Sequence, residues 1–263
     1  MSATVLSAIA GGIARITLNR PAKRNALDRA TIGALTAELR SCAIDPAVRV
    51  VQLSGTGNTF CAGADLTEMQ EQAGAAEAAN LEDAKQLAEL FAVLDCLPKP
   101  TLARVNGDGY GGALGLLAAC DIVVVANEAK FAFTEVRLGI IPAVISPFVL
   151  GKIGERAARR YFLTAETLSA TDLVRLGLAH EAVPADLLDS SCARFTEALL
   201  KGAPGAQGEA KTLIRDMAGG RPNERAASAI EAAGSLARLR TQAEAQEGFA
   251  AFFAKRRATW RRD

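Results

Sequence analysis

Short apolar runs rich in β-branched residues alternate along this chain with segments in which apolar residues recur at helical spacing. The run IARITL and the later runs VRVVQLSG, TLARV, DIVVVA and KFAFTE have the length and composition of strands. Between the first two runs, apolar residues recur with a helical period and predict one buried face: Leu27, Ile32, Leu35 and Leu39. We expect Asp28 to cap that helix. Because strands and helices alternate, the predicted class is α/β with mostly parallel pairing.

The last quarter of the chain has a different pattern. The segment KGAPGAQG, residues 201–208, has the glycine and proline content of a linker. Residues 209–257 are almost entirely helical in pattern. We therefore expect a core over residues 1–200 and a helical appendage over residues 201–263.

The charge balance argues against one class of partners. Of the 263 residues, 30 are Lys or Arg and 29 are Asp or Glu, which gives a net charge of +1. Such a chain lacks the long-range positive field that attracts nucleic acid or an anionic membrane. An anionic ligand would have to be bound by local contacts.

Cysteine and histidine usage argues against a metal centre. The five cysteines have no paired spacing and His180 is the single histidine, so we expect no zinc site. No stretch of about 18 apolar residues is uninterrupted, and the N-terminus lacks a basic leader before a long apolar run. These features predict a reduced, cytoplasmic protein without a membrane span.

The stretch NGDGYGGALGLLAACD, residues 106–121, places four glycines between an expected strand and an apolar helix. Glycines at such a junction indicate that another group approaches the backbone closely. Residues 107–112 satisfy the pattern GxGxxG, and Glu128 follows at about the spacing of a dinucleotide fingerprint. A tight turn that packs a small helix on a sheet satisfies the same pattern, so both interpretations stay open on these residues alone.

A second small-residue turn, CAGADL at residues 61–66, also follows a strand. Backbone N–H groups from these two turns would be able to converge on one carbonyl oxygen and stabilise an oxyanion or enolate, by about 3 kcal/mol per donor. At Gly112 the helix dipole would add to the effect. The alternative for CAGADL is an ordinary turn capped by Asp65.

The motifs together resemble the enoyl-CoA hydratase/isomerase family, the crotonases. The resemblance lies in FCAGADL after VVQLSGTGN, in residues 100–142 from PTLARVNG to RLGIIP, in LNRPAKRNAL near the N-terminus and in EGFAAFFAKRRATW near the C-terminus. It covers nearly the whole chain in the right order. It implies a spiral of ββα units, an acyl-CoA substrate, no cofactor beyond the coenzyme A of the substrate, and C-terminal helices that build a homotrimer or a dimer of trimers.

The resemblance also implies a catalytic apparatus. Ala64 and Gly112 would supply the two N–H groups that hold the thioester oxygen, and Glu135 would be the general acid and base. Hydratases of the family typically carry a second glutamate, and this chain has Gly115 at that position. Three functions therefore remain open: hydration of a 2-enoyl-CoA, double-bond migration by one base, and acyl-CoA binding with little turnover. A dinucleotide-dependent oxidoreductase is the alternative from another class.

Residues 135–166 are similar to the hydratases of branched, carboxylated enoyl-CoAs of the methylglutaconyl-CoA type, which favours hydration. Arg137 would then be a candidate partner for a distal carboxylate, with a structural ion pair as its alternative. The remaining substrate contacts follow from the resemblance alone. Lys23 and Arg24 would lie beside the CoA phosphates; the residues expected near adenine, pantetheine and the thioester are Ala62, Asp65, Leu66 and Gly111. Phe252 and Lys255 would reach the CoA of a neighbouring subunit.

Overall fold

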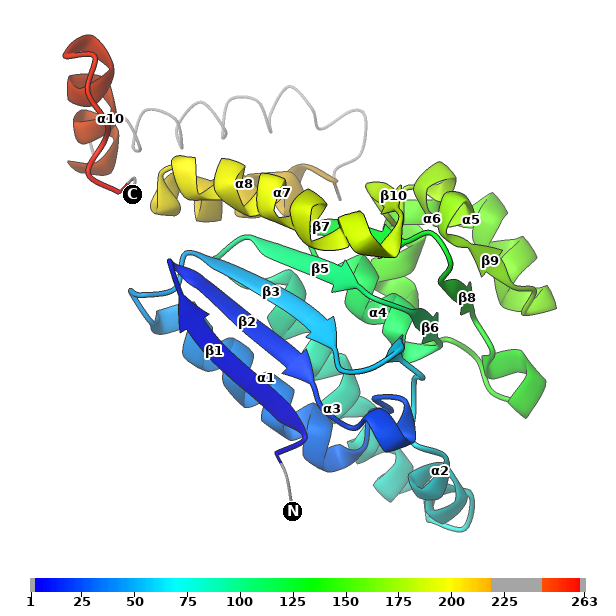
Figure 1. The fold of residues 1–263 in the computed structure, drawn as a ribbon. Helices are drawn as coiled ribbons and strands as arrows, with labels where there is room; N and C mark the ends of the chain where they lie inside the picture. Colours follow the sequence, from blue (N-terminus) through cyan, green and yellow to red (C-terminus); the bar gives the residue numbers. More distant parts are fainter. Residues whose placement is uncertain (1–2, 219–242, 261–263) are drawn as a thin grey trace.

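The computed structural model describes residues 3–218 and 243–260, and Figure 1 shows their arrangement. The strands are β1 (Val5–Ala10), β2 (Ile13–Leu18), β3 (Val50–Gly55), β4 (Thr59–Cys61), β5 (Thr101–Val105), β6 (Asp108–Tyr110), β7 (Ile122–Ala126), β8 (Lys130–Ala132), β9 (Leu168–Ser169) and β10 (Glu181–Val183). The helices are α1 (Arg29–Ile44), α2 (Leu66–Ala73), α3 (Glu77–Asp95), α4 (Gly112–Ala119), α5 (Ser146–Thr164), α6 (Ala170–Leu176), α7 (Leu188–Lys201), α8 (Pro204–Ala218) and α10 (Ala243–Phe253). The 3₁₀ turns are η1 (Pro21–Lys23), η2 (Glu135–Leu138) and η3 (Ala185–Leu187).

The strands form two sheets, and successive strands along the chain join one sheet and then the other. The six-stranded sheet has the order β1-β2-β3-β5-β7-β10, and the four-stranded sheet has the order β4-β6-β8-β9. Each turn of the chain adds one strand to each sheet before a helix follows: β3, β4 and α2, then β5, β6 and α4, then β7, β8 and α5. This is the predicted spiral of ββα units. Pairing is parallel except for β1 with β2 and β8 with β9.

The first helix begins as the sequence predicts. Asp28 is the N-cap of α1, and its Oδ1 accepts the N–H of Thr31 at 2.7 Å. The apolar stripe faces inward, with Leu35 and Leu39 fully buried. Burial of this stripe packs α1 against β2 and α3. Because Asp28 caps the start of this packed helix, it also fixes where the segment before residue 28 joins the core.

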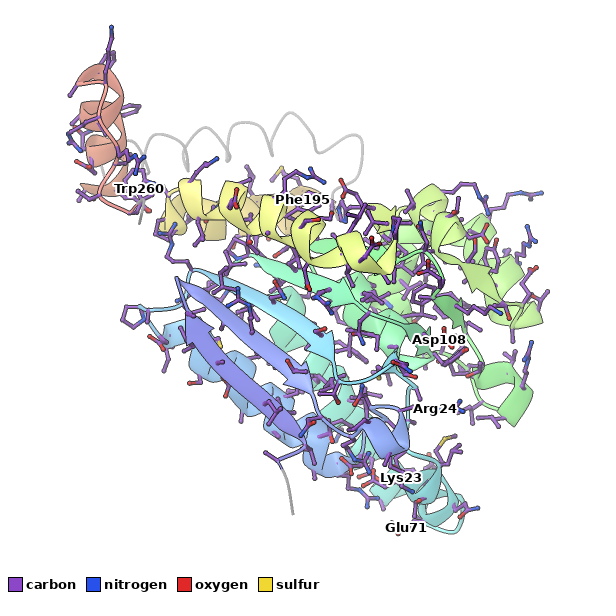
Figure 2. All side chains as sticks on the ribbon, viewed as in Figure 1. Lys23, Arg24, Glu71, Asp108, Phe195 and Trp260 are labelled. Carbon is purple, nitrogen blue, oxygen red and sulfur yellow. The ribbon has the colours of Figure 1, made fainter. Side chains whose placement is uncertain are left out.

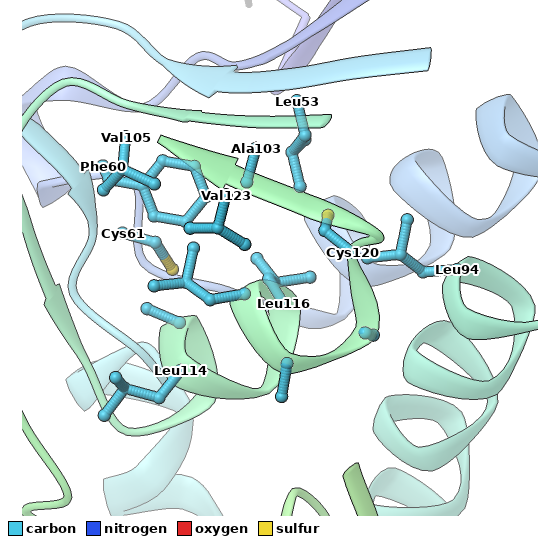
Figure 3. Packing of buried hydrophobic residues seen from close by; sticks show 14 of the residues in the cluster. Leu53, Phe60, Cys61, Leu94, Ala103, Val105, Leu114, Leu116, Cys120 and Val123 are labelled. Atoms are coloured by element: carbon cyan, nitrogen blue, oxygen red, sulfur yellow. The ribbon is translucent and has the colours of Figure 1, made fainter. Parts of the chain in front are cut away.

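Helix α4 forms the centre of the main core. Every residue from Ala113 to Ala119 is buried, and Figure 3 shows Leu116 facing side chains of the large sheet such as Val123. A smaller apolar cluster, built on Leu102 and Leu188, lies where α7 covers the sheet. Because α4 is surrounded by packed side chains, its N-terminus at Gly112 is held in place.

Two segments differ from the sequence prediction. The linker expected over residues 201–208 is wrong for most of its length, because α8 starts at Pro204, and proline is well suited to a first helical turn. This helix is tied to the core through Lys211, whose Nζ lies 2.7 Å from Oδ2 of Asp121. The pattern also did not predict β1, whose residues are mostly exposed. No helix within residues 3–218 and 243–260 is long and apolar enough to cross a bilayer.

We predict opposite stability effects for two glycine-to-alanine changes. A Cβ at Gly107, between β5 and β6, would lie 2.1 Å from the carbonyl oxygen of Asn58, so Gly107→Ala should destabilise the fold by about 2 kcal/mol or more. Gly33 lies on the exposed face of α1 with open space around its Cβ position, so Gly33→Ala should stabilise by about 0.5–1 kcal/mol. Denaturant unfolding of both variants measures this difference, and equal midpoints would contradict it.

Candidate active site

The turn at residues 62–65 is held by the segment that precedes α1. The N–H of Leu27 donates to the carbonyl of Gly63 at 2.7 Å, and the N–H of Asp65 donates to the carbonyl of Leu27 at 3.1 Å. Between these two bonds, the N–H of Ala64 has no acceptor among the described residues, and Ala64 is exposed. The turn therefore presents one free backbone donor at the surface of a fixed loop.

The second turn lies at the start of α4. Gly111 has φ +51° and ψ −116°, a conformation that favours glycine, and its N–H donates to the carbonyl of Ala132 at 3.0 Å. Gly112 is the first helical residue, and its N–H has no acceptor among the described residues. A free N–H at a helix N-terminus carries the partial positive charge of the helix dipole.

The two turns touch each other. Gly63 has φ +84°, and a Cβ at this position would lie 2.6 Å from the carbonyl oxygen of Tyr110 and 3.6 Å from the nitrogen of Gly112. Only glycine fits so close to another backbone. The structure thus brings together the segments that carry Ala64 and Gly112, which are 48 positions apart in the sequence.

The carboxylate of Glu135 lies over the second turn. Glu135 begins η2, and its Oε1 is 3.3 Å from the position that a Cβ of Gly111 would occupy. Its Oε2 is buried and has no hydrogen-bond partner in the described part of the chain. Burial raises the pKa of Glu135 above its ordinary value, although a hydrogen bond from its own backbone N–H opposes the shift. A half-buried carboxylate with a raised pKa beside free N–H donors is suited to proton transfer.

The position of the second family glutamate is filled by hydrocarbon. A Cβ at Gly115 would lie 2.4 Å from Cγ2 of Ile145 and 2.9 Å from the ring of Phe91. Phe91 is fully buried and its ring centroid lies 6.0 Å from that of Phe148. The sequence analysis missed Ile145 and Phe91, because nothing in the local pattern indicates that residues of α3 and of the segment before α5 meet at α4.

Some of the expected substrate-binding residues lie on exposed loops, and others have partners within the protein. Lys23 and Arg24 are exposed in and just after η1, and Figure 2 shows them on the side of the molecule that carries Glu71 of α2 and Asp108 of β6. Leu66 is 73% exposed at the start of α2. Ala62 donates its N–H to the carbonyl of Arg24 at 2.9 Å, which joins the two loops.

Asp65 and Arg137 have partners within the protein. The side chain of Asp65 is buried, where its Oδ1 accepts the N–H of Thr67 at 2.8 Å and its Oδ2 lies 2.8 Å from Nη2 of Arg20. Nη2 of Arg137 donates to the backbone carbonyl of Ala165 at 2.6 Å, so part of its guanidinium is bound within the protein. Both carboxylate oxygens of Asp65 are thus engaged within the protein.

The two C-terminal candidates lie away from these turns within one chain. Figure 1 shows α10 at the opposite end of the molecule from α2 and η2. The end of the α10 region is anchored by Arg49, whose Nη1 donates to the carbonyl of Trp260 at 2.7 Å. Lys255 is exposed, and the side chain of Phe252 is outside the described residues.

The dinucleotide interpretation disagrees with the geometry of the glycine segment. Residues 108–110 form strand β6 of the small sheet rather than a phosphate-binding loop, and α4 has only eight residues. Glu128 is exposed after β7. Within the described residues, no group of three His, Cys, Asp or Glu side chains is placed to hold a metal ion. Nδ1 of His180 accepts the N–H of Val123 at 3.1 Å, so this nitrogen is bound within the fold.

Comparison with known proteins agrees with this geometry. The chain matches the enoyl-CoA hydratase/isomerase family over residues 8–263. It is 34% identical over 201 residues to the 2,3-dehydroadipyl-CoA hydratase of Escherichia coli, which covers 76% of this chain and 77% of that protein. It is 34% identical over 184 residues to the hydroxycinnamoyl-CoA hydratase-lyase of Pseudomonas fluorescens, which covers 69% of this chain and 67% of that protein.

The fold comparison extends over the whole chain. The crystal structure of an enoyl-CoA hydratase from Shewanella pealeana superimposes with a TM-score of 0.94 at 38% identity, and the match covers 98% of this chain and 96% of that one. The predicted crotonase resemblance is therefore confirmed in both sequence and fold. This chain belongs to the enoyl-CoA hydratase/isomerase family.

Proposed function

We propose that this protein adds water to the double bond of a 2-enoyl-CoA, with Ala64 and Gly112 as the oxyanion hole and Glu135 as the only carboxylate base. The observation that carries the proposal is the concentration of unpaired polar groups at one place. The N–H groups of Ala64 and Gly112 and the Oε2 of Glu135 all lack partners among the described residues. Ala64 is exposed and Gly112 is partly exposed, so their donors are accessible to a substrate, and a buried carboxylate oxygen without a partner is uncommon in proteins.

The reaction begins with polarisation of the thioester. Its carbonyl oxygen accepts hydrogen bonds from Ala64 and Gly112, and the dipole of α4 favours the negative charge that develops on that oxygen. The electron pair of the C2–C3 double bond moves toward the carbonyl as an enolate, while the oxygen of a water molecule bonds to C3. Glu135 removes a proton from that water and then returns a proton to C2, so the net change is the addition of one water molecule.

A single carboxylate has to perform both proton transfers. Ile145 and Phe91 fill the space beside Gly115, so this position supplies no second acid to orient the water. We infer that a polar group of the substrate supplies the missing anchor, which favours an acyl chain with its own carboxylate. The Escherichia coli relative named above is a hydratase of 2,3-dehydroadipyl-CoA, a thioester of a dicarboxylic acid. This likeness supports the choice of substrate class.

Double-bond migration is the second candidate, and the same hydrocarbon packing at Gly115 favours it, because isomerisation needs one base and no water. A panel of 2-enoyl-CoA and 3-enoyl-CoA thioesters, including 3-methylglutaconyl-CoA, separates the two reactions. A hydratase removes the ultraviolet absorbance of the conjugated thioester, whereas an isomerase acting on a 3-enoyl-CoA creates it. Tight CoA binding without turnover across the panel would instead indicate a binding protein.

We also propose that the substrate is shared between subunits. Lys23 and Arg24 are exposed beside the 62–65 turn and would contact the CoA phosphates by local charge. Phe252 and Lys255, distant from this turn in their own chain, would reach the CoA of a neighbouring subunit in a homotrimer or a dimer of trimers. Coenzyme A enters as part of the substrate, and the proposed reaction requires no further cofactor.

We predict that Glu135→Gln lowers kcat at least about 100-fold, because the amide does not accept the proton from water. The Kd for acyl-CoA should stay within about threefold of wild type, since the base acts mainly in the transition state. Steady-state hydration assays and calorimetric binding of a saturated acyl-CoA measure the two quantities. The exposed Glu128→Gln is the matched control and should retain full activity. A Glu135→Gln enzyme with most of its rate would refute the assignment of the base.

We further predict that Glu135→Gln is more thermostable than wild type near pH 7.5. Burial raises the pKa of Glu135 above 4.5, so the folded state disfavours the ionised form and loses stability wherever that form predominates. A neutral amide removes this penalty. The gain should shrink as the pH falls through the raised pKa toward 4.5, where wild-type Glu135 becomes protonated in the folded state. Melting temperatures at pH 7.5 and 4.5 test this, and an equal difference at both would contradict it.

We predict that Gly115→Glu destabilises the protein by about 2 kcal/mol or more without raising its hydration rate. Its Cβ would overlap Cγ2 of Ile145, and overpacking of a core has this order of cost. The double variant with Ile145→Ala removes the offending atom and should recover part of the stability. Thermal unfolding and hydration of an unsubstituted 2-enoyl-CoA measure both effects. A stable Gly115→Glu single variant would show that the pocket already has room for a second acid.

A further inference from the structure

The segment that carries the candidate phosphate-binding residues and the turn that carries Ala64 form one hydrogen-bonded unit. Three backbone bonds join them: the N–H of Ala62 to Arg24, the N–H of Leu27 to Gly63, and the N–H of Asp65 to Leu27. Ala64 lies inside this pattern, and its N–H is left without an acceptor among the described residues. The direction of that N–H therefore depends on how firmly the two segments are held together.

Arg20 joins these segments by charge. Its Nη2 lies 2.8 Å from Oδ2 of Asp65 and 2.9 Å from Oδ2 of Asp28, and its Nη1 donates to the carbonyl of Ala26 at 2.6 Å. One guanidinium thus contacts the turn beyond Ala64, the N-cap of α1 and the backbone between them. The planar fork of arginine makes such a three-way contact, and the single ammonium of lysine reaches fewer of these partners at once.

The burial of this cluster makes it energetically important. The side chains of Arg20 and Asp28 are each 17% exposed and that of Asp65 is 4% exposed. Burial alone would raise the pKa of Asp65, but the hydrogen bond from the N–H of Thr67 and the Arg20 guanidinium outweigh it and lower that pKa. Asp65 is therefore ionised at neutral pH. Loss of its cation would leave a buried charge uncompensated, and the turn would rearrange to reach water.

We propose that Arg20 is a positioning residue of the oxyanion hole, which aims the N–H of Ala64 by fixing Asp65 against the segment that bears Lys23 and Arg24. It acts through Asp65 and does not touch the substrate. The same contacts couple the two ends of the substrate, because the loop expected to bind the CoA phosphates and the donor to the thioester oxygen move as one body. This inference rests on the proposed function, since it concerns the same thioester.

The test compares Arg20→Met and Arg20→Lys with wild type on the best 2-enoyl-CoA of the panel. A small displacement of one oxyanion donor should lower kcat about 10- to 100-fold while KM stays within about threefold. Arg20→Lys should recover part of that loss because it keeps the charge beside Asp65. The control is Arg40→Met, which breaks an exposed ion pair with Glu89 whose side chains are 58% and 49% exposed. It should leave kcat unchanged.

A spectroscopic measurement separates positioning from a merely structural role. Butyryl-CoA labelled with ¹³C at the thioester carbonyl is saturated at C2–C3 and does not hydrate, so its carbonyl stretch reports hydrogen bonding to the bound oxygen. Binding to wild type should lower the frequency, and Arg20→Met should lose most of that shift while still binding. A full shift and normal kcat in folded Arg20→Met would overturn the inference. Absence of a shift in wild type would instead overturn the proposed oxyanion hole itself.

Asp65→Asn keeps the inference testable if Arg20→Met does not fold. The amide oxygen still accepts the N–H of Thr67, as Oδ1 of Asp65 does at 2.8 Å, but the charge that Arg20 holds is gone. We expect a similar fall in kcat and a similar loss of the carbonyl shift. Wild-type values of both in Asp65→Asn would contradict a positioning role for the Arg20–Asp65 pair.

Discussion

The close approach of two backbone turns is the constraint on which the rest of this structure depends. Gly63 lies so near Tyr110 that a Cβ would be 2.6 Å from a carbonyl oxygen, and its φ of +84° is itself a glycine conformation. That approach requires β4 and β6 to be neighbours in the small sheet, and the parallel pairing of these strands supplies it. The buried helix α4 then fixes the second turn from behind. The spiral of ββα units is therefore the means by which residues 64 and 112 become neighbours.

The site keeps several polar groups unpaired within a fold that pairs most of its buried polar groups. An unpaired buried polar group costs about 1–3 kcal/mol, and most of the protein avoids this cost through its sheet ladders and caps. The Oε2 of Glu135 is one such buried atom, and the accessible N–H groups of Ala64 and Gly112 are unpaired on the adjoining turns. A ligand with an acceptor oxygen and a transferable proton would satisfy all three. The packed surroundings, including the Arg20 contacts, hold the groups in place for such a ligand.

The sequence predicted the parts of this arrangement that local pattern encodes. Strands β2, β3, β5 and β7, the N-cap of α1 and the glycine turns were all expected, because periodicity and turn chemistry act over a few residues. The sequence did not reveal Ile145 and Phe91 beside Gly115, nor the link from Arg20 to Asp65, because these contacts join positions 24 to 45 residues apart. The linker predicted over residues 201–208 was wrong because composition alone does not distinguish a proline that starts a helix from one that breaks it.

The replacement of a second acid by hydrocarbon changes what sets the basicity of the site. Two carboxylates near one substrate would raise each other's pKa by repulsion, and the pair would titrate as a unit. Here the space beside Gly115 holds Ile145 and Phe91, and burial is the leading cause of the raised pKa of Glu135. The proton affinity of the base is then governed by how well the pocket excludes water. A substrate that brings its own carboxylate would change that affinity on binding, so the acyl chain itself would take part in tuning the base.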